Sequence, residues 1–315
     1  MAKITKSRRL GVSFGSEDLF LVETLKTAEE TVKNFKVTAL LNVTPDIPFS
    51  VDMLTQESGA KIIGSELKNL LIHNNITTKN ASISLDLSLG NVIKIPYSRE
   101  LSEKELSTHL SWELQQYIDD NVAEYAYDYY KIGKSSSELL LVGTRKKVLE
   151  FFREMSRHAG IDLQVVTIDL ISAVNTFEVN YKPYPNENIA LVEIGEQKLV
   201  FTLLQGSSFL GYHYLFLDDS VQNDFINSVL ELITINLKTL FNDYELSADK
   251  NQFDRVFLYR TNTKYSVTQF IEAADQELYM FNPFELVRFD KSLQNKVNQL
   301  ADNSEYVEAL GLTVN

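Results

Sequence analysis

The sequence predicts an α/β fold made of two similar halves, and three observations support this expectation. Strand-like and helix-like apolar patterns alternate along the whole 315-residue chain, which favours mixed layers over an all-helical or all-β fold. A strand-turn-strand pattern near the N-terminus returns about 180 residues later. Between the two copies, residues 182–188 hold two of the six prolines and indicate a linker.

In the first half, short apolar runs predict strands, and apolar residues spaced three or four apart predict helices. The expected strands are residues 9–14, 18–25, 37–43, 82–89, 91–97, 123–132, 138–143 and 163–170. The expected helices are residues 57–74, 101–119, 145–160 and 170–181. Helix 101–119 has a capping box, Ser102 with Glu105. Its expected buried stripe consists of Leu106, Leu110, Leu114 and Tyr117.

In the second half the same signals predict four strands and three helices. The expected strands are residues 189–195, 198–204, 209–217 and 253–259. The expected helices are residues 218–242, 267–278 and 306–314. The long helix 218–242 is expected to begin at Asp218, Asp219 and Ser220, because acidic and hydroxyl residues stabilise a helix N-terminus.

Composition excludes several functional classes. The chain has no cysteine, which rules out disulfides, thiolate metal sites and cysteine nucleophiles. It has 30 basic and 43 acidic residues, a net charge of −13, so nucleic-acid binding is disfavoured. No segment approaches the roughly 20 apolar residues that span a bilayer, and the N-terminus lacks a signal-type apolar run. We therefore expect a cytoplasmic protein without direct membrane insertion.

The repeat becomes specific when the two copies are aligned. Gly15 then corresponds to Gly195, and Ser13 corresponds to Glu193. Each copy has an apolar strand, a polar turn with a glycine and a second apolar strand. Two such hairpins, each opening one half of the chain, predict a duplicated α/β architecture with a cleft between the halves.

This pattern resembles the actin-like ATPases, and more narrowly the type IV pilus assembly family PilM, an FtsA-like branch of that superfamily. The segments that carry the resemblance follow in order as residues 94–118, 139–181, 189–195, 281–289 and 306–312. The resemblance implies a duplicated actin-like (ribonuclease H-like) fold with an inserted subdomain in the first half. It implies a first half of 1–181, with an actin-like part at about 1–75 and 165–181 and an insertion at about 76–164. The second half would cover 188–315, with a C-terminal helix at about 304–312 packing back on the first half.

By the same resemblance, the candidate nucleotide-binding residues are Gly15, Ser16, Glu193 and Gly195. The motifs are degenerate, however. Glu17, Asp18 and Glu196 would place carboxylates beside the phosphates, and like charges about 4 Å apart repel by about 4 kcal/mol at an effective dielectric near 20.

This chain also departs from the family's pattern at the loop that would contact adenosine. That loop has a pair of glycines, yet here the strand 253–259 continues into Arg260, Thr261, Asn262 and Thr263. Two alternatives stay open for the hairpins: the glycines serve a phosphate site or only tight turns, and Glu193 holds a metal through water or is only solvated.

These departures predict a pseudo-ATPase with no catalytic residues and no cofactor; ATP with Mg²⁺ is implied by the resemblance but disfavoured. The four histidines lack metal-ligand spacing, so we expect no metal site. Trp112, on the polar face of helix 101–119, is either a second packing surface or a partner contact. Trp112 and Tyr97 are the candidate partner-binding residues.

The expected function is a cytoplasmic scaffold at the inner face of a bacterial inner membrane, in a type IV pilus or related secretion machine. The resemblance implies that a groove between the first subdomain and the insertion binds the cytoplasmic tail of a PilN-like single-span protein. Other pilus-motor components and self-association are further candidate contacts. One alternative is an active actin-fold ATPase or small-molecule kinase with diverged motifs, in which Glu193 would be the base. The other is an FtsA-like filament former.

Overall fold

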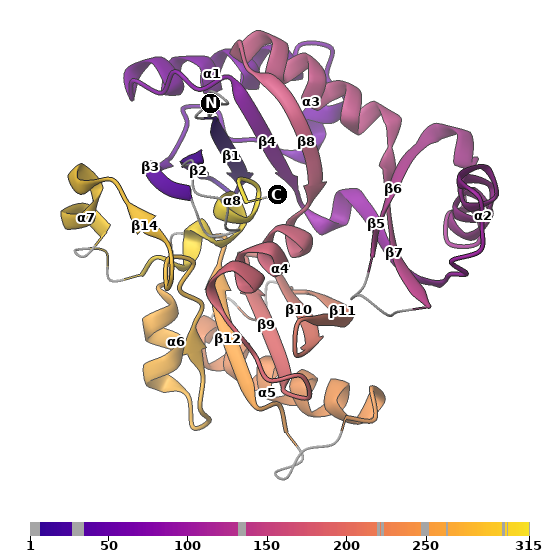
Figure 1. Ribbon diagram of the computed structural model, residues 1–315. Coiled ribbons are helices and arrows are strands. Elements are labelled where there is room, and N and C mark those ends of the chain that lie inside the picture. The colour runs from indigo at the N-terminus through magenta and orange to yellow at the C-terminus, as the bar shows by residue number, and fades with distance from the viewer. Residues whose placement is uncertain are drawn as a thin grey trace, which may run out of the picture.

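Two mixed β-sheets, one in each half of the chain, form the body of the protein (Figure 1). The computed structural model describes residues 7–26, 35–131, 137–218, 221, 224–246, 252–262, 264–297, 300 and 302–314. Of the residues discussed above, Asp219, Ser220 and Thr263 lie outside these ranges.

The first sheet has six strands within the described residues, in the order β14-β3-β2-β1-β4-β8. Strands β1, β2 and β3 form an antiparallel meander, and β4 and β8 continue parallel to β1. The bounds are β1 Arg8–Phe14, β2 Leu19–Lys26, β3 Phe35–Val43, β4 Asn80–Leu85, β8 Asp162–Ile168 and β14 Arg288–Phe289.

Helices cover both faces of this sheet. Helices α1 (Gly59–His73) and α3 (Lys146–Ala159) pack together with the apolar side chains of β1. On the opposite face, α8 (Val307–Gly311) packs against β1 and against α4 (Asp169–Asn180). As Figure 1 shows, α4 and α8 lie at the junction of the two halves.

The second sheet repeats the arrangement of the first, with the order β11-β10-β9-β12-β13. Its first three strands again form an antiparallel meander, and β12 is parallel to β9. The bounds are β9 Asn188–Ile194, β10 Lys198–Gln205, β11 Ser208–Phe216, β12 Arg255–Arg260 and β13 Tyr279–Met280. Helices α5 (Phe225–Asp243) and α6 (Val267–Ala273) share an apolar core with it. The predicted duplication is therefore confirmed.

Within the part of the chain that the structure describes, the insertion is a separate three-stranded antiparallel sheet, β5-β7-β6, with α2 packed on it. Its elements are β5 Gly90–Pro96, α2 Glu103–Gln115, β6 Tyr125–Lys131 and β7 Glu138–Arg145. Ser102 and Glu105 form the expected capping box of α2. Strand β4 and helix α3 fall within the range 76–164, but neither belongs to the insertion. Strand β4 is part of the first sheet, and α3 packs on that sheet.

Several elements differ from the sequence expectations. The strand expected at 82–89 ends at Leu85, because the Asp86 side chain accepts the Ser88 N–H and starts a 3₁₀ turn. Helix α2 ends at Gln115, so Tyr117 falls beyond it and is 59% exposed rather than buried. Helix α5 begins at Phe225, not at Asp218, and α6 ends at Ala273. The short elements β13, β14 and α7 (Lys291–Val297) were not expected at all. For β13 and β14 the reason is that a two-residue strand has no periodicity to detect.

Among the helices of the described ranges, none is both long and apolar enough to cross a bilayer.

Candidate functional site

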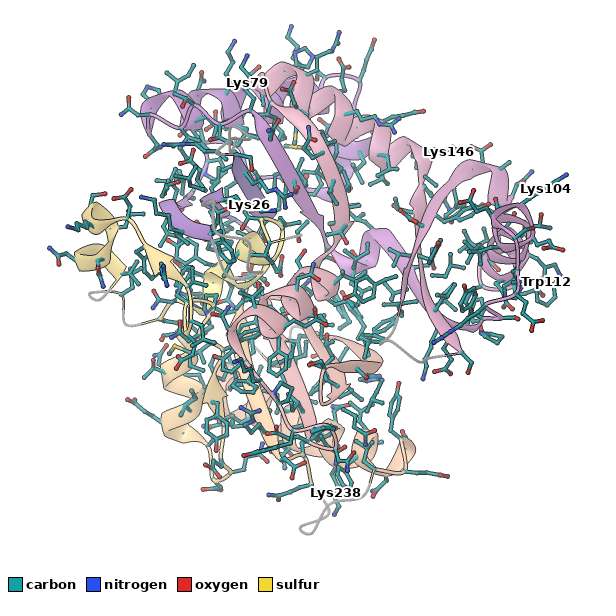
Figure 2. The ribbon with its side chains drawn as sticks, in the orientation of Figure 1. Lys26, Lys79, Lys104, Trp112, Lys146 and Lys238 are labelled. Atoms are coloured by element: carbon teal, nitrogen blue, oxygen red, sulfur yellow. The ribbon has the colours of Figure 1, made fainter. Side chains whose placement is uncertain are left out.

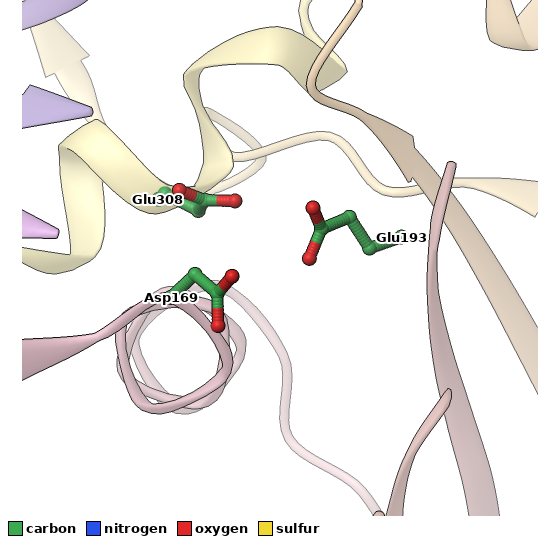
Figure 3. A group of neighbouring side chains, drawn as sticks. All are labelled: Asp169, Glu193 and Glu308. Carbon is green, nitrogen blue, oxygen red and sulfur yellow. The ribbon is translucent and has the colours of Figure 1, made fainter. Parts of the chain in front are cut away.

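Three buried carboxyl groups from distant parts of the chain meet where the two halves join. Asp169 is the first residue of α4, Glu193 lies in β9, and Glu308 lies in α8. One oxygen atom of each lies within 4.8 Å of the others, and all three side chains are buried. Figure 3 shows the three carboxyl groups turned toward one common space. We call these residues the acid cluster.

The ammonium group of Lys198, at the start of β10, lies against this cluster. Its Nζ is 2.6 Å from Glu193 Oε1, 3.0 Å from Asp169 Oδ2 and 2.6 Å from Asp86 Oδ2. Lys198 and Glu193 belong to the second half, whereas Asp86 and Asp169 belong to the first. The ammonium therefore forms ion pairs within one half and across the junction.

Hydroxyl and backbone groups donate further hydrogen bonds to the acid cluster. Glu308 Oε2 accepts hydrogen bonds from Ser13 Oγ at 2.5 Å and Ser84 Oγ at 2.8 Å. Asp169 Oδ2 accepts the Leu87 N–H at 3.0 Å. Glu308 Oε1 is buried and has no hydrogen-bond partner among the described residues. A buried acceptor without a partner is costly and points to a proton or cation at this position.

Burial and the neighbouring charges shift the proton affinities of the cluster. Burial raises the pKa of Glu193 to about 7, with Lys198 opposing the change and Asp169 adding to it. Burial, followed by the charges of Glu193 and Asp169, raises the pKa of Glu308 well above its usual range. Burial opposes ionisation of Asp86, yet the Lys198 ammonium outweighs it and lowers the pKa of Asp86.

The same environment keeps Lys198 charged. Burial alone would lower the pKa of Lys198, but the carboxylates of Asp169, Glu193 and Asp86 outweigh this and raise it well above its ordinary value. Lys198 is therefore an ammonium ion, and the cluster holds at least one proton on its carboxyl groups at neutral pH, because burial and mutual repulsion disfavour full ionisation.

The two hairpin glycines both lie in tight turns. Gly15 N–H donates to the Asp18 carbonyl at 2.8 Å, and Gly195 N–H donates to the Lys198 carbonyl at 2.9 Å. A Cβ on Gly195 would lie 2.7 Å from Cγ of Lys198, and one on Gly15 would lie 2.6 Å from the Thr261 carbonyl oxygen. Gly195 thus makes room for the lysine stem, and the first hairpin touches the loop after β12.

The expected sources of repulsion at these turns are arranged differently from the prediction. Ser16, Glu17 and Glu196 are exposed, while Asp18 is buried and accepts a hydrogen bond from Thr44. The alternative that Glu193 is only solvated is wrong, since its side chain is fully buried and paired with Lys198.

The segment after β12 is occupied by contacts within the chain. Arg260 is buried and forms ion pairs with Asp302 at 3.0 Å and Glu305 at 2.5 Å. Asn262 donates to the Ile194 carbonyl at 2.9 Å. In the resemblance drawn above this loop would contact adenosine, whereas here its side chains tie β12 to β9 and to the C-terminal segment.

The residues present do not fit an Mg²⁺-nucleotide site. A magnesium ion among Asp169, Glu193 and Glu308 would have to displace the Lys198 ammonium, which lies 2.6–3.0 Å from two of these carboxylates. Mg²⁺ also prefers to keep several of its own waters, which a buried, directly paired cluster does not accommodate.

A second site lies between the insertion and the first sheet. A cavity of about 640 Å³ is lined by residues of β6, β7 and β8, with Leu149 and Arg153 of α3 and Ile171 of α4. Strands β6 and β8 are the terminal strands of their sheets and pair on one side only within the described residues. We call this cavity the insertion groove.

The two candidate partner-binding residues lie outside this groove. Trp112 is 60% exposed and projects from the outer side of α2 (Figure 2), so it is not a second packing surface against the described residues. Tyr97 is half-buried and packs on the core of the insertion. Their role as partner contacts stays a prediction.

The sequence patterns did not mark Lys198, Asp86, Asp169 or Glu308 as site residues. Asp169 stands at a strand-to-helix junction and Lys198 follows the second glycine turn, which are weak signals for function. Glu308 has no local signal, because only the return of α8 to the first half brings it to the junction.

The duplicated sheets, joined through α4, define the class of actin-like proteins. A Bacteroides thetaiotaomicron protein of actin-like ATPase fold and unknown function matches with a TM-score of 0.51 and 11% identity, over 95% of this chain and 100% of that chain. A family model described as type IV pilus assembly protein PilM matches residues 11–213. The chain belongs to the PilM family.

A solved structure entitled PilM-PilN type IV pilus biogenesis complex has the same fold. It matches with a TM-score of 0.75 and 17% identity, over 98% of both chains. A search of curated proteins gave no match.

Proposed function

We propose that this chain is a scaffold of a type IV pilus or related secretion machine, and that its insertion groove binds the cytoplasmic tail of a PilN-like inner-membrane protein. The observation that carries the proposal is a groove of about 640 Å³ bordered by two edge strands. Family membership and the similar fold of a PilM protein solved together with PilN support it.

The groove suits an extended peptide. Edge strands carry backbone N–H and C=O groups whose hydrogen bonds to a peptide give affinity, and pockets for its alternate side chains give specificity. Val165 of β8 is 43% exposed. An exposed apolar edge strand is an aggregation hazard unless a partner covers it. Tyr127, Tyr129 and Tyr130 border the groove from β6. A tail with a few apolar anchors would cover both edges.

Charge supports the same partner. The net charge of −13 favours association with a basic, membrane-proximal tail through electrostatic steering. Binding to such a tail would place the protein peripherally at the inner face of the inner membrane, without inserting a segment of its own.

A binding assay with a matched pair of variants tests docking. Val165→Arg adds bulk and charge within the groove, and Ile235→Arg makes the same change on α5, where Ile235 is 54% exposed. A fluorescent peptide with the sequence of a PilN-like cytoplasmic tail should bind wild type and Ile235→Arg equally. Val165→Arg should weaken binding at least about tenfold, or about 1.4 kcal/mol. Equal affinities of the two variants would contradict the groove assignment.

We also propose that docking needs no ATP turnover. Lys198 at the acid cluster and the absence of glycine from the segment that directly follows β12 (residues 261–310) support this part. Calorimetry with Mg-ATP should give no micromolar binding, and phosphate release should not exceed the buffer rate. Hydrolysis that Glu193→Ala abolishes would instead support an active actin-fold ATPase.

A further inference from the structure

We propose that the Lys198 ammonium takes the place of a divalent cation at the acid cluster and holds the two halves of the chain together without metal or nucleotide. The inference goes beyond docking, because none of these residues lines the insertion groove. It gives the proposed lack of ATP turnover a specific cause.

The acid cluster has the arrangement of a cation site, and the Lys198 ammonium occupies it. Carboxylate oxygens from three separate elements converge to within 4.8 Å, an arrangement that hard divalent cations favour. Here the cation is supplied by the chain, since Lys198 Nζ contacts Glu193 and Asp169 directly. An ammonium on a side chain cannot diffuse away, so the cluster is compensated at any metal concentration.

The ion pairs of Lys198 with Asp86 and Asp169 cross the junction between the two halves. Lys198 extends from β10 of the second half, and its partners Asp86 and Asp169 lie at the ends of β4 and β8 in the first. Opening the junction would separate Lys198 from the buried carboxylate of Asp169 and from the half-buried carboxylate of Asp86. Breaking a buried pair is costly because it leaves an uncompensated charge. A freely binding cation would make closure conditional, whereas the tethered one makes it constitutive.

The carboxyl groups of the acid cluster keep the capacity to coordinate a metal ion. Among the described residues, buried Glu308 Oε1 has no hydrogen-bond partner, and Glu308 is 3% exposed. With the ammonium removed, Asp169, Glu193 and Glu308 would offer three carboxylates to one ion. Removing the lysine charge should therefore uncover a latent divalent-metal site.

The experiment compares metal binding by the full chain and its variants, with MnCl₂ as the probe. Wild type should leave Mn²⁺ free in electron paramagnetic resonance titrations, and its thermal midpoint should not respond to the metal. Lys198→Met should have a lower midpoint in chelator-treated buffer and should bind one Mn²⁺ per chain, about 100-fold or more tightly than wild type. Its midpoint should rise with MnCl₂.

Two further variants make the result specific. Lys238→Met removes an exposed lysine from α5 of the same half and should behave as wild type (Figure 2). Lys198→Met combined with Asp169→Asn should lose the added Mn²⁺ affinity. Mn²⁺ binding by wild type that Asp169→Asn abolishes would overturn the proposal. So would a Lys198→Met chain that stays unfolded in saturating MnCl₂, because a divalent cation would then not replace the ammonium. Loss of tail binding by Val165→Arg, by contrast, bears only on docking.

Discussion

The buried carboxyl group of Glu193 predicts how the stability of this protein depends on pH. Burial raises its pKa from 4.5 to about 7. A carboxyl group with a raised pKa binds its proton more tightly in the folded state than in the unfolded state. The free energy of unfolding therefore falls as the pH rises from about 4.5 to about 7, and this contribution levels off above that range.

Replacing Glu193 with glutamine removes this contribution and keeps the size of the side chain. The shift is about 2.5 units, from 7 − 4.5. At about 1.4 kcal/mol per unit it corresponds to about 3 kcal/mol once both states are ionised. Between pH 5 and pH 8, wild type should lose roughly 2 to 3 kcal/mol relative to Glu193→Gln.

Urea unfolding followed by circular dichroism at pH 5, 6, 7 and 8 measures this difference. Taking the difference between the two proteins cancels groups that titrate in the same way in both. Glu17→Gln removes an exposed carboxylate from the matching first turn and serves as the control. A wild-type-minus-variant difference that stays constant across the pH range would refute the reasoning, since Glu193 would then titrate alike in both states.

Three other substitutions have defined outcomes. Gly311→Ala should lower the free energy of unfolding by about 1–3 kcal/mol or more, because the new Cβ would lie 1.8 Å from the Ser172 carbonyl oxygen; a chain as stable as wild type in urea would contradict that contact. Arg260→Met should cost about 3–5 kcal/mol by leaving two buried carboxylates unpaired, whereas Lys36→Met, at a more exposed pair, should cost no more than about 1 kcal/mol by the same measurement. Trp112→Ala should change the free energy of unfolding by at most about 0.5 kcal/mol, since the ring is 60% exposed; a larger loss in the same assay would place Trp112 in the fold rather than at a partner surface.

The local elements were predictable because each carries its own pattern. The stripe of Leu106, Leu110 and Leu114 and the Ser102 cap marked α2 without reference to the rest of the chain. The predicted boundaries of helices and strands were wrong where a polar side chain or a tertiary contact decided them. Tyr117 continued the apolar spacing, but the helix had already ended at Gln115.

The acid cluster was not predictable in the same way. Of its members, only Glu193 was singled out from the sequence, through the repeat. Lys198 is five residues further on and Glu308 is in the last short helix, and nothing in their local patterns connects them. Acidic residues near the turns suggested repulsion of phosphate, but Glu17 and Glu196 are exposed.

The sequence by itself determined most of the strands, the main helices, the duplication near an offset of 180 residues and the family resemblance, because these depend on the order of residues along the chain. The tertiary structure alone decided that four carboxyl groups and one ammonium meet at the junction of the halves. It did so through contacts between residues that lie far apart in the chain, such as Ser13 with Glu308, which are 295 positions apart. Burial then set their charge states, since the proton affinity of a carboxyl group depends on what surrounds it in space.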